Sequence, residues 1–424
     1  MTLEQLDKQN IWHPYTALQQ SFEPLVISSA KGIYLFTSDG KKIIDGISSW
    51  WVNLHGHCNP IIADAISEQA RKLEHVIFAG FTHEPAIKLS ENLLKILPDN
   101  HSKIFFSDNG STAVEVAIKM AIQFWRNQGN HRRRKIIAIE GAYHGDTFGS
   151  MAVSGRSIFT DAFKEYLFNV DFIDFPNDDN EEKVKDQFKQ LIHVGDVAAF
   201  IFEPLVQGAS GMRIYSPDIL NELLKIANEA NVISIADEVF TGFGRTGKIL
   251  ASEYLAHKPD IITLSKGITG GFLPLGVTSC SKSIISEFNS PDYSKTLYHG
   301  HSYTANPLAC AAANASFAIT TSSDCSAAIA TISKHQELFC NSIRKNRHVK
   351  SVKCLGTILS IELKSSDKSG YTNDWREVIY PYFLERGILL RPLGNVLYVL
   401  PPYVINLNEL KFIHSEIEEF LDGR

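Results

Sequence analysis

The sequence has no apolar run of membrane-span length and no excess of positive charge. Its 424 residues are 44% hydrophobic and 21% charged, with a formal net charge of -6. A membrane-spanning helix needs about 20 consecutive apolar residues, and nucleic-acid-binding proteins usually carry a basic patch. These absences exclude membrane insertion and disfavour nucleic-acid binding. The composition is that of a globular chain long enough for more than one domain.

The chain also lacks paired cysteines and metal-ligand spacings. Its six cysteines show no CxxC spacing: Cys58, Cys280, Cys310, Cys325, Cys340 and Cys354. With no signal-peptide pattern at the N-terminus, we expect a cytoplasmic protein with reduced thiols. The pairs His55-Gly56-His57 and His299-Gly300-His301 have no helical i,i+4 spacing and no cysteine or carboxylate cluster around them, so we expect loop residues and no metal.

Short apolar runs alternate with helix-length segments through the middle of the chain. The runs are Lys103–Phe106, Lys135–Ile139, Ala198–Phe202, Val232–Ala236 and Ile261–Leu264. This alternation predicts an α/β fold with βαβ crossovers and a mostly parallel sheet covered on both faces. Ligands of such sheets bind at the carboxyl ends of the strands.

Two of these strands end in residues suited to one cofactor. Lys266 follows the run Ile261–Leu264 and precedes glycines, while Asp237 ends the run before it. A lysine can hold an aldehyde as a Schiff base, and a carboxylate can keep a pyridinium nitrogen protonated. The pair therefore predicts a pyridoxal 5'-phosphate site, with Val239 and Tyr143 on opposite faces of the ring and with His144 and Asp146 as supporting residues.

A phosphate seat is predicted where the strand at Lys103–Phe106 gives way to a helix. Gly110 and Ser111 lie at the start of that helix, in a segment that could equally serve only as an N-cap and turn. Its position in the same layer as Asp237 and Lys266 favours the phosphate role.

Further blocks flank this core. Strands are predicted at Gly32–Phe36, near Leu355–Ile361 and at Leu389–Arg391, and a long helix through Pro307–Ala313. We expect an N-terminal segment, 1–49, packed with a small C-terminal α+β domain, 306–424, and a large cofactor-binding domain, 50–305, between them.

Three motifs resemble the signature of class III pyridoxal-phosphate aminotransferases: Asp237–Gly247, Leu264–Gly271 and Asn306–Ala309. The resemblance runs over nearly the whole chain. It implies a fold type I transferase with a seven-stranded-type, mostly parallel sheet and a smaller α+β domain. It also implies a homodimer in which the partner subunit contacts the phosphate, and Gly300, His301 and Ser302 occupy the corresponding stretch.

Within the class, four stretches resemble the members that aminate 8-amino-7-oxononanoate with S-adenosyl-L-methionine, giving 7,8-diaminononanoate in biotin biosynthesis. They are Ile11–Thr16, Ser48–Trp51, Glu203–Met212, and Arg391-Pro392 with Tyr398–Pro402. The resemblance implies a ping-pong exchange through an internal aldimine on Lys266. The catalytic residues would be Lys266, Asp237 and Tyr15. Substrate would contact Tyr15, Trp50, Tyr143, Lys266, Gly300, Arg391 and Tyr398.

Other functions remain open at this point. Glutamate-using members of the class often have an acid shortly after the Glu-Pro dipeptide, whereas here Gln207-Gly208-Ala209-Ser210 contains none, which disfavours a glutamate/2-oxoglutarate cycle. Lysine could be the donor to the same acceptor, or the chain could be another class III ω-amino-acid transaminase or an aminomutase. A non-enzymatic regulator on the same fold is a more distant alternative, because the core pattern begins too early to leave room for a DNA-binding domain.

Overall fold

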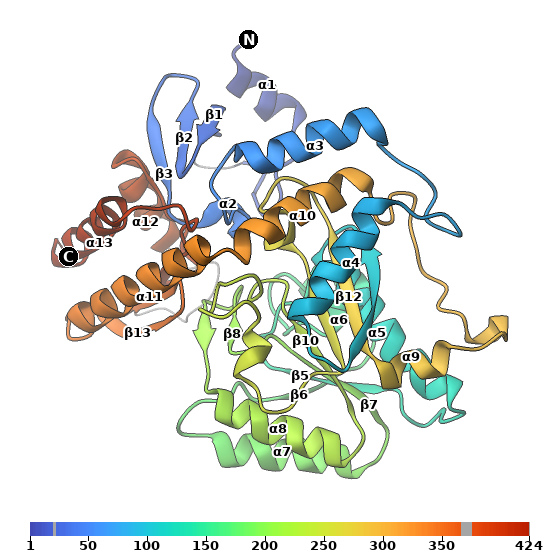
Figure 1. Ribbon diagram of the computed structural model, residues 1–424. Helices are drawn as coiled ribbons and strands as arrows, with labels where there is room; N and C mark the ends of the chain where they lie inside the picture. The colour runs from blue at the N-terminus through green and yellow to red at the C-terminus, as the bar shows by residue number, and fades with distance from the viewer. Residues whose placement is uncertain (20–22, 366–374, 424) are drawn as a thin grey trace.

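A seven-stranded sheet lies at the centre of the computed structural model, which describes residues 1–19, 23–365 and 375–423 (Figure 1). The strands, in spatial order, are β4 (His101–Ser107), β12 (Gly276–Ser281), β11 (Ile261–Leu264), β10 (Ile233–Asp237), β7 (Val197–Phe202), β5 (Lys135–Ile139) and β6 (Asp171–Ile173). Pairing is parallel from β11 to β6, and β12 is antiparallel to both of its neighbours. The predicted mostly parallel sheet is confirmed, and so are its five predicted strands; β12 and β6 were not predicted.

The sheet is apolar on both faces because helices cover both. Along β5, Ile137 and Ile139 join one buried cluster while Ile136 and Ala138 join the other. This alternation follows from the two-residue period of a strand. Helix α5 (Gly110–Asn127) covers one face, and the helices of the opposite face include α8 (Pro217–Glu229) and α4 (Glu84–Ile96). The site residues at the strand ends are therefore held by a rigid, doubly covered layer.

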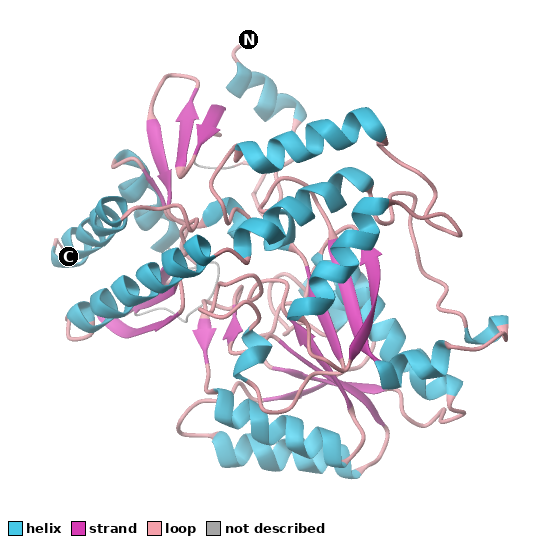
Figure 2. Ribbon diagram, viewed as in Figure 1, coloured by secondary structure: helices cyan, strands magenta, loops and turns pink. Residues whose placement is uncertain are grey.

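Smaller sheets lie beside the central one, and one of them joins the two ends of the chain (Figure 2). One contains β1 (Ile27–Lys31), β2 (Tyr34–Thr37), β3 (Lys42–Asp45) and β15 (Ile388–Leu389), and another contains β13 (Val349–Leu355), β14 (Ile358–Leu363) and β16 (Val396–Val399). β3 and β15 pair in parallel, which ties the N-terminal segment to the C-terminal part of the chain. The domain limits at 49/50 and 305/306 stay a prediction.

Two runs predicted as single strands each contain the turn of a hairpin in the structure, so the predicted bounds of those strands were wrong. The run Gly32–Phe36 contains the turn between β1 and β2, with Gly32 at φ +60°. The run Leu355–Ile361 contains the turn between β13 and β14, with Gly356 at φ +58°. A Cβ on Gly356 would lie 2.2 Å from the carbonyl carbon of Thr246, so a close approach of backbone requires this glycine.

The predicted linking helix is confirmed as α10 (Pro307–Thr320), and a second helix, α11 (Ser323–Ile343), follows it directly. Asn306 caps α10 by accepting from the backbone amides of Leu308 and Ala309, both at 3.0 Å. The remaining helices are α1 (Leu3–Asn10), α2 (Ser48–Trp51), α3 (Pro60–Lys72), α6 (Phe148–Ala152), α7 (Glu181–His193), α9 (Lys282–Phe288), α12 (Trp375–Glu385) and α13 (Leu407–Asp422). Among the described residues, no helix is long and apolar enough to span a membrane.

Candidate active site

Asp237 and Lys266 come together at the carboxyl ends of adjacent strands. Asp237 is the last residue of β10 and lies opposite Thr263 of β11, while Lys266 follows β11 by two residues. Lys266 has φ +45°, a left-handed conformation that is strained for a residue with a side chain. Gly270 and Gly271 continue the turn at φ +64° and +89°. Because strained backbone is concentrated at functional sites, the conformation of Lys266 supports a functional role for this residue.

The Lys266 amine is buried against aromatic rings. Its Nζ lies 4.8 Å from the ring centroid of Trp51 and 5.7 Å from that of Phe240. Burial lowers the pKa of Lys266, and the carboxylates of Asp237 and Glu203 oppose that shift. A lowered pKa increases the neutral fraction of the amine, which is the nucleophilic form.

Three donors fix the Asp237 carboxylate. His144 Nδ1 donates to it at 2.6 Å, the Val239 amide at 3.0 Å and the Thr263 hydroxyl at 3.2 Å. His144 is 3% exposed, and its Nε2 atom is buried without a hydrogen-bond partner among the described residues. The histidine predicted only as a supporting residue is thus the direct partner of the carboxylate.

The first turn of α5 provides backbone donors beside Val239. Asn109 caps the helix, because its side chain accepts from the Thr112 amide at 3.0 Å. The amides of Gly110 and Ser111 lie in the first turn, where no helical carbonyl can accept from them. A Cβ on Gly110 would lie 2.7 Å from Val239 Cγ1, so only glycine allows the helix start to come this close.

These groups line one cavity of about 480 Å³. It brings together all the residues that sequence analysis assigned to the cofactor within one chain: Gly110, Ser111, Tyr143, Asp237, Val239 and Lys266. A cavity of this size is typical of a small-molecule site. It offers an amine, a fixed carboxylate and a helix N-terminus, which match the aldehyde, ring nitrogen and phosphate of pyridoxal phosphate. The residues present therefore fit that cofactor.

A second cavity, of about 190 Å³, adjoins the first at Lys266 and Tyr143. It is lined by Tyr15, Trp50, Tyr143, Lys266, Arg391 and Tyr398, which are all the predicted substrate residues except Gly300. The Arg391 guanidinium lies 5.0 Å from the ring centroid of Trp50, and the rings of Tyr15 and Trp50 are 5.6 Å apart. The cavity therefore combines the Arg391 guanidinium and the Lys266 amine with aromatic walls.

Two tyrosine hydroxyls meet one carboxylate at this cavity. Tyr143 donates to Asp146 at 2.9 Å, Tyr15 donates to the same Asp146 oxygen, and the two hydroxyl oxygens are 3.1 Å apart. Burial, reinforced by the hydrogen bond between Tyr143 and Tyr15, raises the pKa of Tyr143. The Tyr143 phenol consequently stays protonated and can donate hydrogen bonds.

The wall that carries the tryptophans has a strained backbone. Ser48, Ser49 and Trp51 have φ of +54°, +59° and +66°. The buried carboxylate of Asp45 accepts from the Ser49 amide and hydroxyl, both at 2.8 Å, and from His57 Nε2 at 2.9 Å. These bonds offset the cost of the left-handed residues.

Sequence reasoning missed several residues that line the two cavities. Trp51 donates from its indole to the Tyr398 hydroxyl at 3.0 Å, and Phe159 packs edge-on against Tyr15 at 5.6 Å. Glu203 is buried and accepts from the amides of Tyr143 and Gly208, both at 3.0 Å; burial raises its pKa to about 7. The doublet Trp50-Trp51 was a signal for Trp51, whereas nothing in the sequence singles out Phe159.

Gly300, His301 and Ser302 lie elsewhere in the chain, in a third cavity of about 590 Å³. His301 Nδ1 accepts from the Tyr303 amide at 3.2 Å, so a neutral His301 carries its proton on Nε2. That Nε2 atom is buried without a hydrogen-bond partner among the described residues. Within one chain, these three residues do not reach Lys266.

Comparison with known proteins identifies the family. The family model "Aminotransferase class-III" matches residues 15–421. The chain is 46% identical to adenosylmethionine-8-amino-7-oxononanoate aminotransferase of Synechococcus elongatus, over 97% of this chain and 98% of that protein. The crystal structure of the enzyme with the same name from Methanocaldococcus jannaschii superposes with a TM-score of 0.94 at 36% identity, covering 99% of this chain and 98% of that one. An amine transaminase from an uncultivated Pseudomonas species, solved in its PLP-bound form, is 29% identical with a TM-score of 0.90, covering 96% and 97% of the two chains.

The chain belongs to the class III aminotransferase family. Membership confirms the predicted fold class, the transaminase activity and the dependence on pyridoxal phosphate.

Proposed function

We propose that this protein transfers an amino group from S-adenosyl-L-methionine to 8-amino-7-oxononanoate, giving 7,8-diaminononanoate for biotin biosynthesis. The observation that carries the proposal is the 190 Å³ cavity, which places Lys266 and Arg391 in one aromatic-walled space. An aliphatic keto acid needs apolar walls along its chain and a cation for its carboxylate. The names of the relatives at 46% and 36% identity agree with this reading.

Pyridoxal phosphate, when bound, withdraws electrons from the carbon that bears the amino group. Lys266 is the proposed catalytic base and acid, which moves one proton at that carbon with its buried amine. Asp237, fixed by His144, is proposed to hold the ring nitrogen. Tyr143 and Val239 are proposed to flank the ring, and the first-turn amides of Gly110 and Ser111 to hold the phosphate.

Substrate recognition is assigned to the second cavity. Arg391 is proposed to bind the carboxylate of either substrate through paired hydrogen bonds. Trp50 and Tyr398 are proposed to pack against the substrate chain. Tyr15 and Tyr143, joined through Asp146, are proposed to orient the group beside Lys266. The proposed order is ping-pong, in which the donor leaves before the ketone enters.

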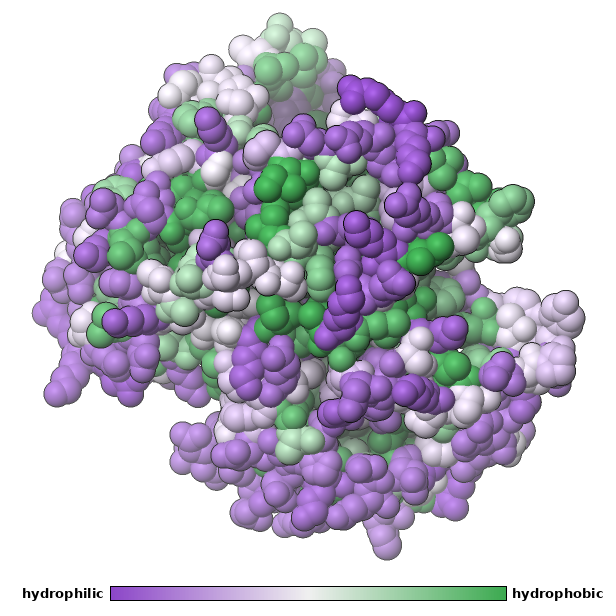
Figure 3. Space-filling view, viewed as in Figure 1, coloured by the Kyte–Doolittle hydropathy of each residue, from purple (hydrophilic) through white to green (hydrophobic). Residues whose placement is uncertain are grey.

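A homodimer with a shared site is proposed as well. In Figure 3, the face that carries α3, α4 and α10 shows green, apolar patches between purple ones. Ile77, Phe81, Tyr298 and Tyr303 are 60 to 68% exposed and belong to the two segments, near residues 77 and 300, that line the third cavity. Exposed apolar clusters of this kind mark interaction surfaces. Gly300, His301 and Ser302 are proposed to complete the phosphate and substrate contacts of a second copy.

Location in the cytoplasm stays a prediction.

The half-reaction of the purified holoenzyme tests the function. S-adenosylmethionine, lysine and glutamate are added singly, and loss of the yellow absorbance of the bound cofactor is followed. Conversion by S-adenosylmethionine alone is expected. Conversion only by lysine would change the donor but keep the acceptor, and rapid conversion by glutamate would assign a different class III transamination.

A further inference from the structure

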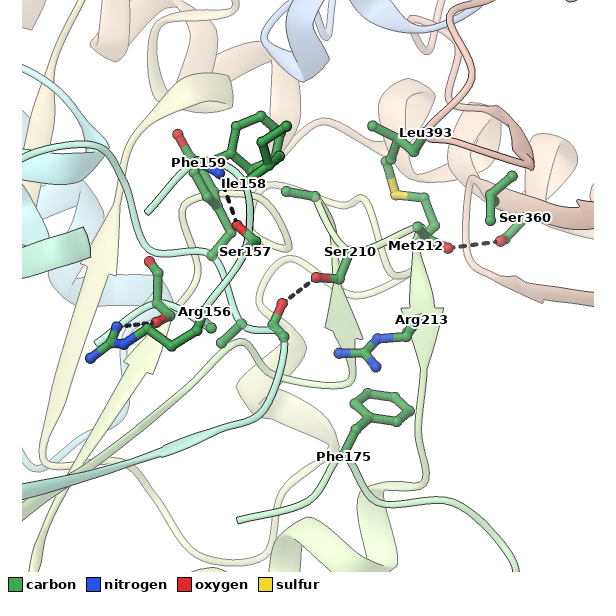
Figure 4. A pocket seen from close by; sticks show the side chains of 18 of the residues that line it. Arg156, Ser157, Ile158, Phe159, Phe175, Ser210, Met212, Arg213, Ser360 and Leu393 are labelled. Carbon is green, nitrogen blue, oxygen red and sulfur yellow. Dashed lines mark hydrogen bonds between the residues drawn. The ribbon is translucent and has the colours of Figure 1, made fainter. Parts of the chain in front are cut away.

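Another cavity lies beside the substrate cavity and has no role in the function proposed above. It measures about 660 Å³ and lies between the segments 141–160 and 209–214 and the C-terminal sheet that contains β14 and β16 (Figure 4). Four residues line both it and the substrate cavity: Tyr143, Phe159, Ala209 and Leu393. The two spaces therefore meet at one wall.

The substrate cavity is too small for the whole of the proposed donor. Its 190 Å³ is below the roughly 300–1,000 Å³ of pockets that enclose drug-sized ligands. An aliphatic keto acid is slender, but S-adenosylmethionine joins an amino acid to a nucleoside through a sulfonium. With its amino group at Lys266 and its carboxylate at Arg391, the donor must place the nucleoside outside this cavity.

The adjoining cavity has the chemistry that a purine needs. Met212 and Val396 are 1% and 9% exposed and give it apolar surface, and Phe159 and Leu393 stand at the shared wall (Figure 4). A purine presents a flat apolar face and ring nitrogens that accept hydrogen bonds.

Arg213 supplies a donor in this cavity. Its guanidinium stacks 4.1 Å from the ring centroid of Phe175, and Nη2 donates to the Glu140 carbonyl at 2.7 Å and to Gln207. Its Nε atom is buried and has no hydrogen-bond partner among the described residues. The Arg213 side chain thus carries more donor capacity than its contacts use, and it lines the cavity.

We propose that this cavity is the subsite for the nucleoside half of the amino donor, an inference that rests on the proposed function. The adenine packs among Met212, Val396 and Leu393, and a ring nitrogen accepts from Arg213. The sulfonium lies at the shared wall, where the ring of Phe159 favours a cation. The ketone acceptor, which has no nucleoside, does not enter this cavity. Selectivity between donor and acceptor therefore depends on residues that do not contact Lys266.

The test separates the two half-reactions. The donor half uses S-adenosylmethionine with holoenzyme, and the acceptor half uses 8-amino-7-oxononanoate with protein loaded with pyridoxamine phosphate. Ser157→Trp fills the cavity from an exposed loop position, and Arg213→Gln removes the guanidinium. Glu165→Trp, at an exposed position that lines none of the four cavities described, is the matched control.

Both variants are expected to raise the half-saturating donor concentration about tenfold or more and to leave that of the acceptor within about twofold. Equilibrium dialysis of adenosine is an independent readout, and adenosine is expected to bind wild type and the control but to bind both variants about tenfold more weakly.

Equal changes in both half-reactions, or none in the donor half, would overturn the subsite while leaving the proposed function standing. Failure of wild type to react with S-adenosylmethionine would overturn the proposed function and the subsite together.

Discussion

The cofactor cavity and the substrate cavity share Lys266 but are built differently. The first draws Asp237, Lys266 and the Gly110 turn from strand ends of one sheet, and it buries Asp237 and His144 almost completely. The second collects Tyr15, Trp50 and Arg391 from segments far apart in the chain, and Trp50 is 44% exposed. The difference shows that one sheet positions the residues proposed for the chemistry, whereas segments far apart in the chain form the cavity proposed for the substrate.

Loss of the shared lysine is expected to have the largest effect. Lys266→Ala should lower the rate of both half-reactions on the order of 10⁴-fold, because no other amine of the described residues lines the two cavities. Stopped-flow absorbance measures this, and circular dichroism checks the fold. Turnover near the wild-type rate would remove Lys266 from its proposed role.

The second-largest effect is expected from a substitution in the cofactor cavity. Asp237→Ala is expected to cost about 3–5 kcal/mol of cofactor binding and chemistry together, because the buried His144 then loses its carboxylate. Titration with pyridoxal phosphate measures the loss of cofactor binding, and half-reaction rates measure the loss in chemistry. Thr263→Val, which removes only the 3.2 Å hydroxyl contact, is the control and should have a much smaller effect. An active, yellow Asp237→Ala protein would contradict the assignment.

The loop that carries the substrate wall should show a pH-dependent stability. His55 follows Trp51 by four residues and is 3% exposed beside Ser316 and Thr320 of α10. Burial, together with the Arg245 charge, lowers its pKa from 6.5 to about 4. Between these values the unfolded chain binds a proton that the native chain does not. The free energy of unfolding contributed by His55 is therefore present above pH 6.5 and lost as the pH falls to about 4.

Denaturant titrations at pH 7 and pH 4 measure this dependence. The loss of stability attributable to His55 is about 3 kcal/mol, and His55→Gln should abolish it. His131→Gln, at an exposed position, should retain the wild-type difference. The same pH dependence in His55→Gln and wild type would show that another group titrates.

On the substrate side, Arg391→Ala is expected to weaken binding of the keto acid by about 2 kcal/mol, because a charge-assisted hydrogen bond is lost. The Michaelis constant for this acceptor should rise while cofactor binding stays at the wild-type level. Arg391→Lys retains the charge without the planar guanidinium, so its Michaelis constant should lie between those of wild type and Arg391→Ala. Weaker cofactor binding in Arg391→Ala would mean that the two cavities are not separable in function.

The smallest effect is expected at the tyrosine pair. Tyr15→Phe removes the hydroxyl that meets Tyr143 and Asp146 but keeps the ring against Trp50. A loss of about 1 kcal/mol in kcat/KM is expected for both substrates. Asp146→Asn should have a similar effect, since it changes the shared acceptor. A loss as large as that of Lys266→Ala would assign Tyr15 a direct part in proton transfer.

The structure brings the residues predicted for each cavity together, except Gly300, His301 and Ser302, which lie in the third cavity. Asp237 and Lys266 follow apolar strands, and strand order in an α/β sheet brings such ends together. His144 was recognised only as a supporting residue, because a loop histidine gives no sign of which carboxylate it will meet. Trp51 was not singled out, because the inward turn of its indole depends on left-handed residues at Ser48 and Ser49. No sequence pattern singles out Phe159.

By itself, the sequence determined the α/β core, the lysine and aspartate of the cofactor site, and the helix start that faces them, because these follow from local periodicity and strand ends. Only the tertiary structure decided that β12 runs antiparallel, that β3 pairs with β15, and that a 660 Å³ cavity adjoins the one lined by Arg391. Such features arise from contacts between residues far apart in the chain, and no local pattern encodes them.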